Sequence, residues 1–150
     1  MTTTHEPVWP SDMGLRASRR LHLISLGLLL GLTVGMFADV LFTAKPIVLS
    51  SNNTDLFLQF IHWRSFGFEE LRHGNLALWN PHLFSGAPFF GGFQSALLYP
   101  PNVLFLVLPL GTAINWSIAL HVFLAGAFTY WWTARRGLHP QACFLSAIMF

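Results

Sequence analysis

Residues 74–102 read GNLALWNPHLFSGAPFFGGFQSALLYPPN, and this stretch decides how the rest of the chain is interpreted. It contains no Asp, Glu, Lys or Arg. Proline and glycine interrupt it repeatedly, so no long helix can run through it. We therefore expect a loop, with breaks at Pro81, Gly86, Pro88, Gly91, Gly92, Pro100 and Pro101.

The same stretch is rich in aromatic and uncharged polar side chains. This mixture suits a water–lipid interface, because an aromatic ring there can be apolar on one side and hydrogen-bonded on the other. Two interpretations stay open for the stretch by itself: a packed aromatic loop without chemistry, and a binding surface. Its aromatic residues are Trp79, Phe84, Phe89, Phe90, Phe93 and Tyr99, and its polar residues are Asn80, His82, Ser85, Gln94 and Asn102.

The composition of the whole chain indicates a membrane protein. Hydrophobic residues make up 53% of the sequence, charged residues only 9%, and the mean hydropathy is +0.53. Soluble domains are roughly one quarter charged. The net charge is +2, but the basic residues lie in small groups beside apolar runs, so we interpret them as topology signals and expect no nucleic-acid partner. The single cysteine, Cys143, excludes an internal disulfide.

The first membrane helix is expected over residues 21–44, after a cytoplasmic tail of residues 1–20. At about 1.5 Å per residue this run is long enough to cross a hydrocarbon core of roughly 30 Å. Arg16, Arg19 and Arg20 precede it, which places the N-terminus in the cytoplasm by the positive-inside rule. The apolar run is too long for a cleaved signal peptide and lacks its small-residue ending.

Residues 45–112 are expected to form a large extracytoplasmic loop that carries interfacial helices. Within it, residues 55–73 read as an amphipathic helix when plotted at about 100° per residue. Thr54 is suited to cap this helix, and Gly67 is expected to kink or split it. The polar side holds Asp55, Gln59, His62, Glu69 and His73, and the apolar side holds Phe57, Phe60, Ile61, Phe68 and Leu71.

The chain after the loop returns to the membrane. Residues 103–110 are apolar but too short to span, so we expect a partial helix at the interface. The second membrane helix is expected over 113–134, and Arg135 with Arg136 puts its C-terminal end in the cytoplasm. Residues 135–141 are then expected to form a cytoplasmic turn, and residues 142–150 to begin a third membrane helix that is truncated at Phe150.

Candidate ligand groups lie mainly in the outer loop. Arg64 and Arg72 are candidates for holding a phosphate, and by helical position Arg64 is expected to snorkel and Arg72 to be the better partner. A divalent metal is possible, but no dense ligand spacing such as His-Glu-x-x-His occurs, so no metal site is assigned. The histidines and carboxylates considered for it are His62, His73, His82, Asp55, Glu69 and Glu70.

Short motifs follow one another in a fixed order from Asp55 onward. They are Asp55-x-x-x-Gln59, Gly74-Asn75-x-x-x-Trp79-Asn80-Pro81, Gly86-x-Pro88, Gln94, Tyr99-Pro100-Pro101-Asn102, and His121 with Gly126 and Tyr130. This order resembles the N-terminal region of the YfhO-type bacterial membrane proteins, which belong with the glycosyltransferases of the C-type fold (GT-C). The resemblance covers about residues 54–150, and the Trp-Asn-Pro and Tyr-Pro-Pro-Asn elements carry most of its specificity.

The resemblance implies an all-α polytopic protein of the bacterial inner (plasma) membrane, with a large first extracytoplasmic loop. It implies transfer of a sugar from a polyprenyl-phosphate donor to a cell-envelope acceptor, with Asp55 in the place of the catalytic acidic residue. Such chemistry needs a base for the acceptor hydroxyl, cationic groups for the phosphate and aromatic faces for the sugar. We therefore predict Asp55 as the catalytic residue and, as substrate-binding residues, Gln59, His62, Arg72, Trp79, Asn80, Gln94 and Tyr99.

Two other functions stay open at this point. A polytopic transporter or flippase-like protein would show polar residues at mid-membrane, and His121 is such a residue. A non-catalytic membrane scaffold would not depend on Asp55. His121 also fits a helix-to-helix hydrogen-bonding role.

Overall fold

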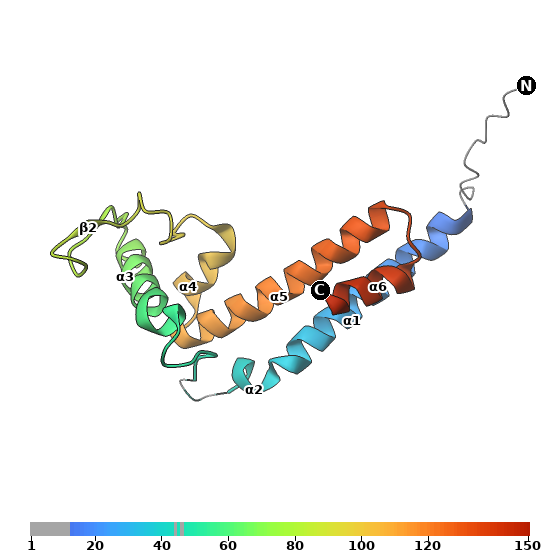
Figure 1. Cartoon of the computed structure of the whole chain (residues 1–150), viewed down its shortest axis with the longest axis horizontal. Coiled ribbons are helices and arrows are strands. Elements are labelled where there is room, and N and C mark those ends of the chain that lie inside the picture. Colours follow the sequence, from blue (N-terminus) through green and yellow to red (C-terminus); the bar gives the residue numbers. More distant parts are fainter. Residues whose placement is uncertain (1–12, 44, 46) are drawn as a thin grey trace, which may run out of the picture. The chain divides into compact units, whose positions relative to one another are not determined.

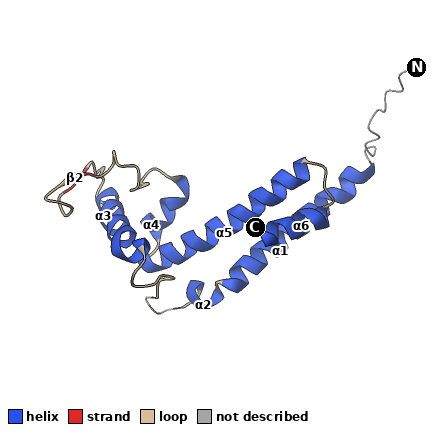
Figure 2. Cartoon of the chain, in the orientation of Figure 1, coloured by secondary structure: helices blue, strands red, loops and turns tan. Residues whose placement is uncertain are grey.

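The structure, a computed structural model, describes residues 13–43, 45 and 47–150. It is mostly helical, as expected, and the strands of the described residues form only a two-residue ladder (Figure 2). The elements in chain order are α1 (Met13–Met36), α2 (Ala38–Leu41), the π-helical turn η1 (Leu56–Phe60), α3 (Ile61–Arg72), β1 (Trp79–Asn80), β2 (Ala87–Pro88), the 3-10 turn η2 (Pro100–Val103), α4 (Leu104–Val107), α5 (Leu110–Arg135) and α6 (Pro140–Met149).

The chain divides into two compact units. The helical unit comprises the chain up to Gly35 together with Val122–Phe150, and the loop unit comprises Met36–His121. Helix α5, labelled in Figure 1, is shared: its residues up to His121 belong to the loop unit, and those from Val122 on belong to the helical unit.

The helical unit has a small core shared by α1, α5 and α6. Leu29 of α1, Tyr130 of α5 and Cys143 of α6 are buried together in it. Gly126 allows this close approach, because a Cβ at that position would lie 3.0 Å from Leu29 Cδ2 and 3.2 Å from Ala147 O. The helices therefore pack through small residues, as membrane helices often do.

Two helices of the described chain are long and apolar enough to cross a membrane by length and composition. Their apolar segments are Arg19–Met36, with a mean hydropathy of 1.2, and Leu110–Arg135, with a mean hydropathy of 1.4. Only 11% of the first segment is buried, and Leu23, for example, is 70% exposed. These helices therefore present large aliphatic surfaces that the described chain leaves uncovered.

The helix that carries the first candidate span has other bounds than the expected 21–44. α1 begins at Met13 and ends at Met36, and after Phe37 the chain makes only the short helix α2. The backbone that follows is held by a side chain from α5, because Asn115 Nδ2 donates to the carbonyls of Val40 and Ile47. The helical hydrogen bonding of the first span thus ends where the Asn115 side chain provides other partners for the backbone.

The loop unit is organised around α3 and an aromatic core. Phe68 of α3 stacks on Phe105 of α4, with 5.0 Å between ring centroids. Three residues of the stretch 74–102, Ala77, Phe89 and Leu97, belong to this core. Part of the stretch is therefore a packed loop, which is one of the two interpretations given above. The buried core residues are Phe68, Ala77, Phe89, Leu97, Phe105, Ala113 and Ile114.

The expected amphipathic helix is present, but it starts with a π-helical turn. Within this turn Phe57, expected on the apolar side, is 45% exposed. Thr54 Oγ1 accepts a hydrogen bond from the Phe57 N–H at 3.4 Å, as expected of a cap. Gly67 does not split the helix, because α3 continues through it to Arg72.

Candidate functional site

The loop packs an aromatic ring against α3. Phe89, which follows β2, lies edge-on to Phe66 and Trp63, with ring centroids 5.2 Å and 6.1 Å away. Gly67 makes this approach possible, because a Cβ there would lie 2.8 Å from Phe89 Cε1. Helix α3 and the loop therefore pack against each other, and both contribute walls to a cleft.

The hairpin fixes the other wall. β1 and β2 pair antiparallel, and Asn80 in β1 is buried. Its Oδ1 accepts a hydrogen bond from the His82 N–H at 2.9 Å, which is an Asx turn. Gly86 has a φ of +116° and lies against the indole of Trp79, so this position excludes a side chain.

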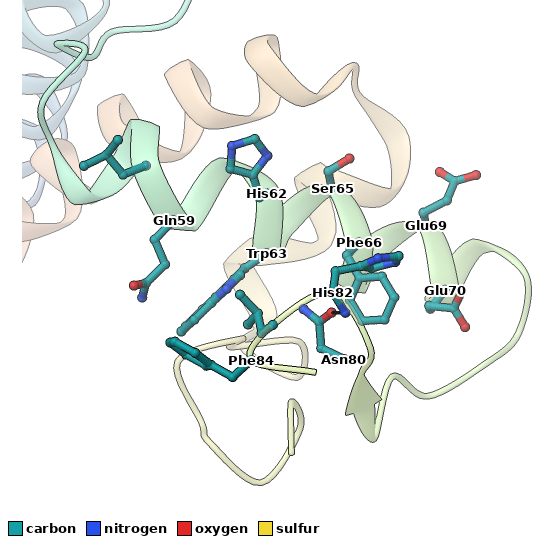
Figure 3. Close-up of a pocket in the computed structure, with 12 residues that line it drawn as sticks. Gln59, His62, Trp63, Ser65, Phe66, Glu69, Glu70, Asn80, His82 and Phe84 are labelled. Carbon is teal, nitrogen blue, oxygen red and sulfur yellow. Dashed lines mark hydrogen bonds between the residues drawn. The ribbon is translucent and has the colours of Figure 1, made fainter. Parts of the chain in front are cut away.

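A cleft of about 660 Å³ lies between α3 and the hairpin turn; we call it the α3 cleft (Figure 3). Figure 3 shows Trp63 and Phe66 turned toward the loop, while His62 and Glu69 project from the other edge of α3. The lining residues are Leu58, Gln59, His62, Trp63, Ser65, Phe66, Glu69, Glu70, Asn80, His82, Leu83 and Phe84.

The α3 cleft combines aromatic surface with many neutral and acidic hydrogen-bonding groups. Trp63 Nε1 is buried and has no acceptor among the described residues. Phe66 lies edge-on to the His82 imidazole, 5.6 Å away. Glu69 is bound by Arg72 at 2.9 Å, whereas no ion pair or side-chain hydrogen bond of Glu70 occurs within the described chain. Such a lining can bind a polyhydroxylated ligand through its hydroxyls and its apolar faces.

A second cleft of about 390 Å³ lies on the other side of α3, toward α4 and α5; we call it the Arg64 cleft. Its walls are mostly apolar, with a few polar groups. Leu56, the residue directly after Asp55, takes part in it. The lining residues are Leu56, Phe60, Arg64, Ala96, Tyr99, Asn102, Phe105, Ile114, Ser117, Ile118 and His121.

Tyr99 and His121 form a hydrogen-bonded pair in the Arg64 cleft. His121 Nδ1 lies 2.6 Å from the Ser117 carbonyl, which can only accept, so Nδ1 carries a proton. In neutral His121, Nε2 is then the acceptor for the Tyr99 hydroxyl at 2.9 Å. Both ring nitrogens of His121 therefore have hydrogen-bonding partners within the loop unit.

The two arginines are both engaged with backbone carbonyls. Arg72 binds Glu69 and donates from Nη2 to the Phe105 carbonyl at 2.7 Å, so it ties the end of α3 to α4. Arg64 donates from Nη1 to the carbonyls of Ser95 and Gln94. Arg64 was expected to extend toward lipid headgroups, and in the structure its guanidinium contacts the loop backbone. Arg72, expected to be the better phosphate partner, already has acceptors for its donors.

The predicted site residues do not form one site. Gln59, His62 and Asn80 line the α3 cleft, and Tyr99 lines the Arg64 cleft. Gln94 is exposed and accepts a hydrogen bond from Gln59 at 3.4 Å. The remaining three, Asp55, Trp79 and Arg72, line neither cleft.

The sequence interpretation missed Asn115. This side chain is 2% exposed and makes three hydrogen bonds to the chain after α2, from Nδ2 to Val40 and Ile47 and at Oδ1 from the Leu49 N–H. Its position in the sequence could have indicated this role, because Asn115 is a polar amide within an apolar helix and a buried amide must find hydrogen-bond partners. Its role is to fix the entry into the loop.

The described residues include no cluster of three or more His, Cys, Asp or Glu side chains arranged to hold a metal ion. Comparison of the chain with known proteins finds no matching family, no matching curated protein and no matching solved structure.

Proposed function

We propose that this chain is the N-terminal region of an integral membrane glycosyltransferase of the C-type fold. The enzyme would transfer a sugar from a polyprenyl-phosphate donor to a cell-envelope acceptor. The order of motifs from Asp55 to Tyr130 motivates the proposal. The α3 cleft is the single structural observation that supports it best, because it offers amide, imidazole, carboxylate and aromatic groups together.

The lining of the α3 cleft suits a sugar for a physical reason. Sugar hydroxyls both donate and accept, so they need mixed partners such as the amides of Gln59 and Asn80 and the carboxylate of Glu70. The apolar face of a sugar ring needs an apolar surface, which Trp63 and Phe84 supply. The indole N–H of Trp63 has no acceptor within the described chain, so it is a further hydrogen-bond donor at this cleft.

The membrane setting rests on the two apolar helices and the basic residues beside them. In the proposed arrangement the protein is multi-pass in the bacterial plasma membrane, with its N-terminus and Arg135-Arg136 in the cytoplasm and the loop unit outside. Cysteines placed singly at Asn75 and Leu138, both exposed, test this after Cys143→Ala. An impermeant thiol reagent on intact cells should label Asn75→Cys and spare Leu138→Cys. The reverse pattern would put the loop on the wrong side for a lipid-linked donor.

We assign the general base to Asp55. Its side chain is exposed, and within the described chain it has no ion pair or hydrogen-bond partner, so it is free to accept a proton from an acceptor hydroxyl. General-base catalysis is typically worth about 10²- to 10⁴-fold. Asp55→Asn should therefore lower turnover by that order in membranes containing the protein expressed from its complete gene.

The matched control is Asp39→Asn, which changes an exposed aspartate in α2 in the same way. Transfer of labelled sugar from a polyprenyl-phosphate donor is measured at equal protein abundance. Asp39→Asn should keep the rate of the unmodified protein. A normal rate in Asp55→Asn would refute the catalytic assignment, and no transfer by the unmodified protein with any polyprenyl-phosphate sugar would refute the proposed function.

A further inference from the structure

Arg64 is a half-buried cation whose counter-charge is missing from the described chain. No carboxylate of the described residues lies within ion-pair distance of it. Its Nη1 donates to the Ser95 and Gln94 carbonyls, and its guanidinium carbon lies 5.8 Å from the Phe105 ring centroid. Nε and Nη2 find no acceptor in the described chain, although a guanidinium offers five N–H donors.

Burial of this cation is unfavourable without an anion. Burial lowers the pKa of the Arg64 guanidinium, yet an arginine stays protonated at any ordinary pH, so the positive charge remains in the cleft. Two backbone carbonyls compensate only part of the lost hydration. An anion at Nε and Nη2 would supply the missing charge and accept the unused donors together.

The Arg64 cleft has the right composition for an amphiphile. Arg64 is its only side chain with a permanent charge, and Tyr99 with His121 adds polar groups nearby. The rest of the lining is largely aliphatic or aromatic, including Leu56, Phe60 and Ile118. A free inorganic anion would use the cation and leave this apolar wall without a partner.

We propose that the Arg64 cleft binds the phosphate of an isoprenoid phosphate, with Nε and Nη2 of Arg64 on the phosphate oxygens and the hydrocarbon chain along the apolar wall. The choice of an isoprenoid rests on the proposed function; the anion site rests on the geometry of Arg64. Because the two clefts lie on different sides of α3, the α3 cleft would then hold the sugar of the acceptor, and the sugar bonded to this phosphate would stay on the Arg64 side. This assignment moves the phosphate from Arg72, which is bound to Glu69 and Phe105, to Arg64.

The sharpest test places a negative charge beside Arg64. Ala96 lines the cleft and has a φ of +46°, a conformation that Asp and Asn tolerate better than other side chains. Ala96→Asp and Ala96→Asn have nearly the same shape and differ in charge. Ala96→Asp should weaken binding of farnesyl phosphate at least tenfold, because it repels the phosphate, whereas Ala96→Asn should stay within about twofold of the unmodified protein.

Removal of the cation gives the second measurement. Arg64→Gln should lose about tenfold or more in affinity for farnesyl phosphate, as expected for charge-assisted hydrogen bonds, and Arg72→Gln should lose little. Arg64 also holds the Ser95 carbonyl, so its variant can lose stability; the Ala96 pair leaves that bond intact and decides the matter in that case. Equal affinities in Ala96→Asp and Ala96→Asn would overturn the proposal.

Three probes identify the ligand on the detergent-purified protein expressed from its complete gene: farnesyl phosphate, farnesol and inorganic phosphate. Farnesyl phosphate should bind tightest. Farnesol binding as tightly would overturn the anion site, and inorganic phosphate binding as tightly would overturn the isoprenoid part. In the unmodified protein, failed sugar transfer together with intact binding of farnesyl phosphate would refute the enzyme and leave this site standing.

Discussion

The threonines of the helical unit and the longer polar side chains of the loop unit bind backbone carbonyls at different distances along the chain. In the helical unit, hydroxyls such as those of Thr33 and Thr129 donate to the carbonyl four residues earlier in the same helix. In the loop unit, Asn115, Arg64 and Arg72 reach backbone carbonyls more than 25 residues away in sequence. Regular helices satisfy their own backbone, whereas irregular chain needs distant side chains to do so.

This difference implies that single substitutions should have unequal effects in the two units. A polar anchor in the loop unit serves groups that have no other partner, so its removal leaves several of them unsatisfied at once. A threonine or serine hydroxyl in the helical unit only adds a bond to a carbonyl that the helix already uses. The largest losses of stability are therefore expected at the anchors of the loop unit.

Asn115→Ala should give the largest effect. It removes three hydrogen bonds, each worth about 0.5–1.5 kcal/mol, and it leaves the carbonyl of buried Val40 without its partner. We expect a loss of about 3 kcal/mol or more, measured by unfolding of the purified protein in detergent. The control is Asn53→Ala, an exposed amide in the same unit, which should change stability by less than about 0.5 kcal/mol. Similar losses in both variants would contradict the anchoring role.

The helices could be predicted from sequence because their signals are local. The apolar run of α5 and the alternation of faces along α3 depend only on neighbouring residues, and the short helix α4 followed from an apolar run too short to span. The break of the first span at Phe37 could not be predicted in the same way, since the partner that replaces the helix is Asn115, far along the chain.

The division of the predicted site into two clefts has the same origin. Gln59 and Tyr99 are both polar residues of the expected outer loop, and their sequence positions do not say on which side of α3 each lies. The partners of Arg64 and Arg72 could not be predicted because both bind backbone carbonyls, which every residue possesses and no sequence pattern marks. The sequence therefore indicated which side chains can form hydrogen bonds, but not which groups they bind.

Two glycine-to-alanine substitutions, one in each unit, should have smaller effects on stability and should differ in sign. Gly67 lies in α3, where a Cβ would come within 2.6 Å of Leu97 Cδ2 and 2.8 Å of Phe89 Cε1, whereas at Gly31 in α1 no atom lies within 4 Å of such a Cβ. Gly67→Ala should cost about 1–3 kcal/mol from overpacking, partly offset by a helix-propensity gain of up to about 1 kcal/mol. Gly31→Ala should show only the gain, so the two variants should change the unfolding midpoint in opposite directions.

Leu97→Ala combined with Gly67→Ala should recover part of the overpacking cost, because it removes one of the two clashing groups. A purely additive result would mean that contact with Leu97 is not the cause.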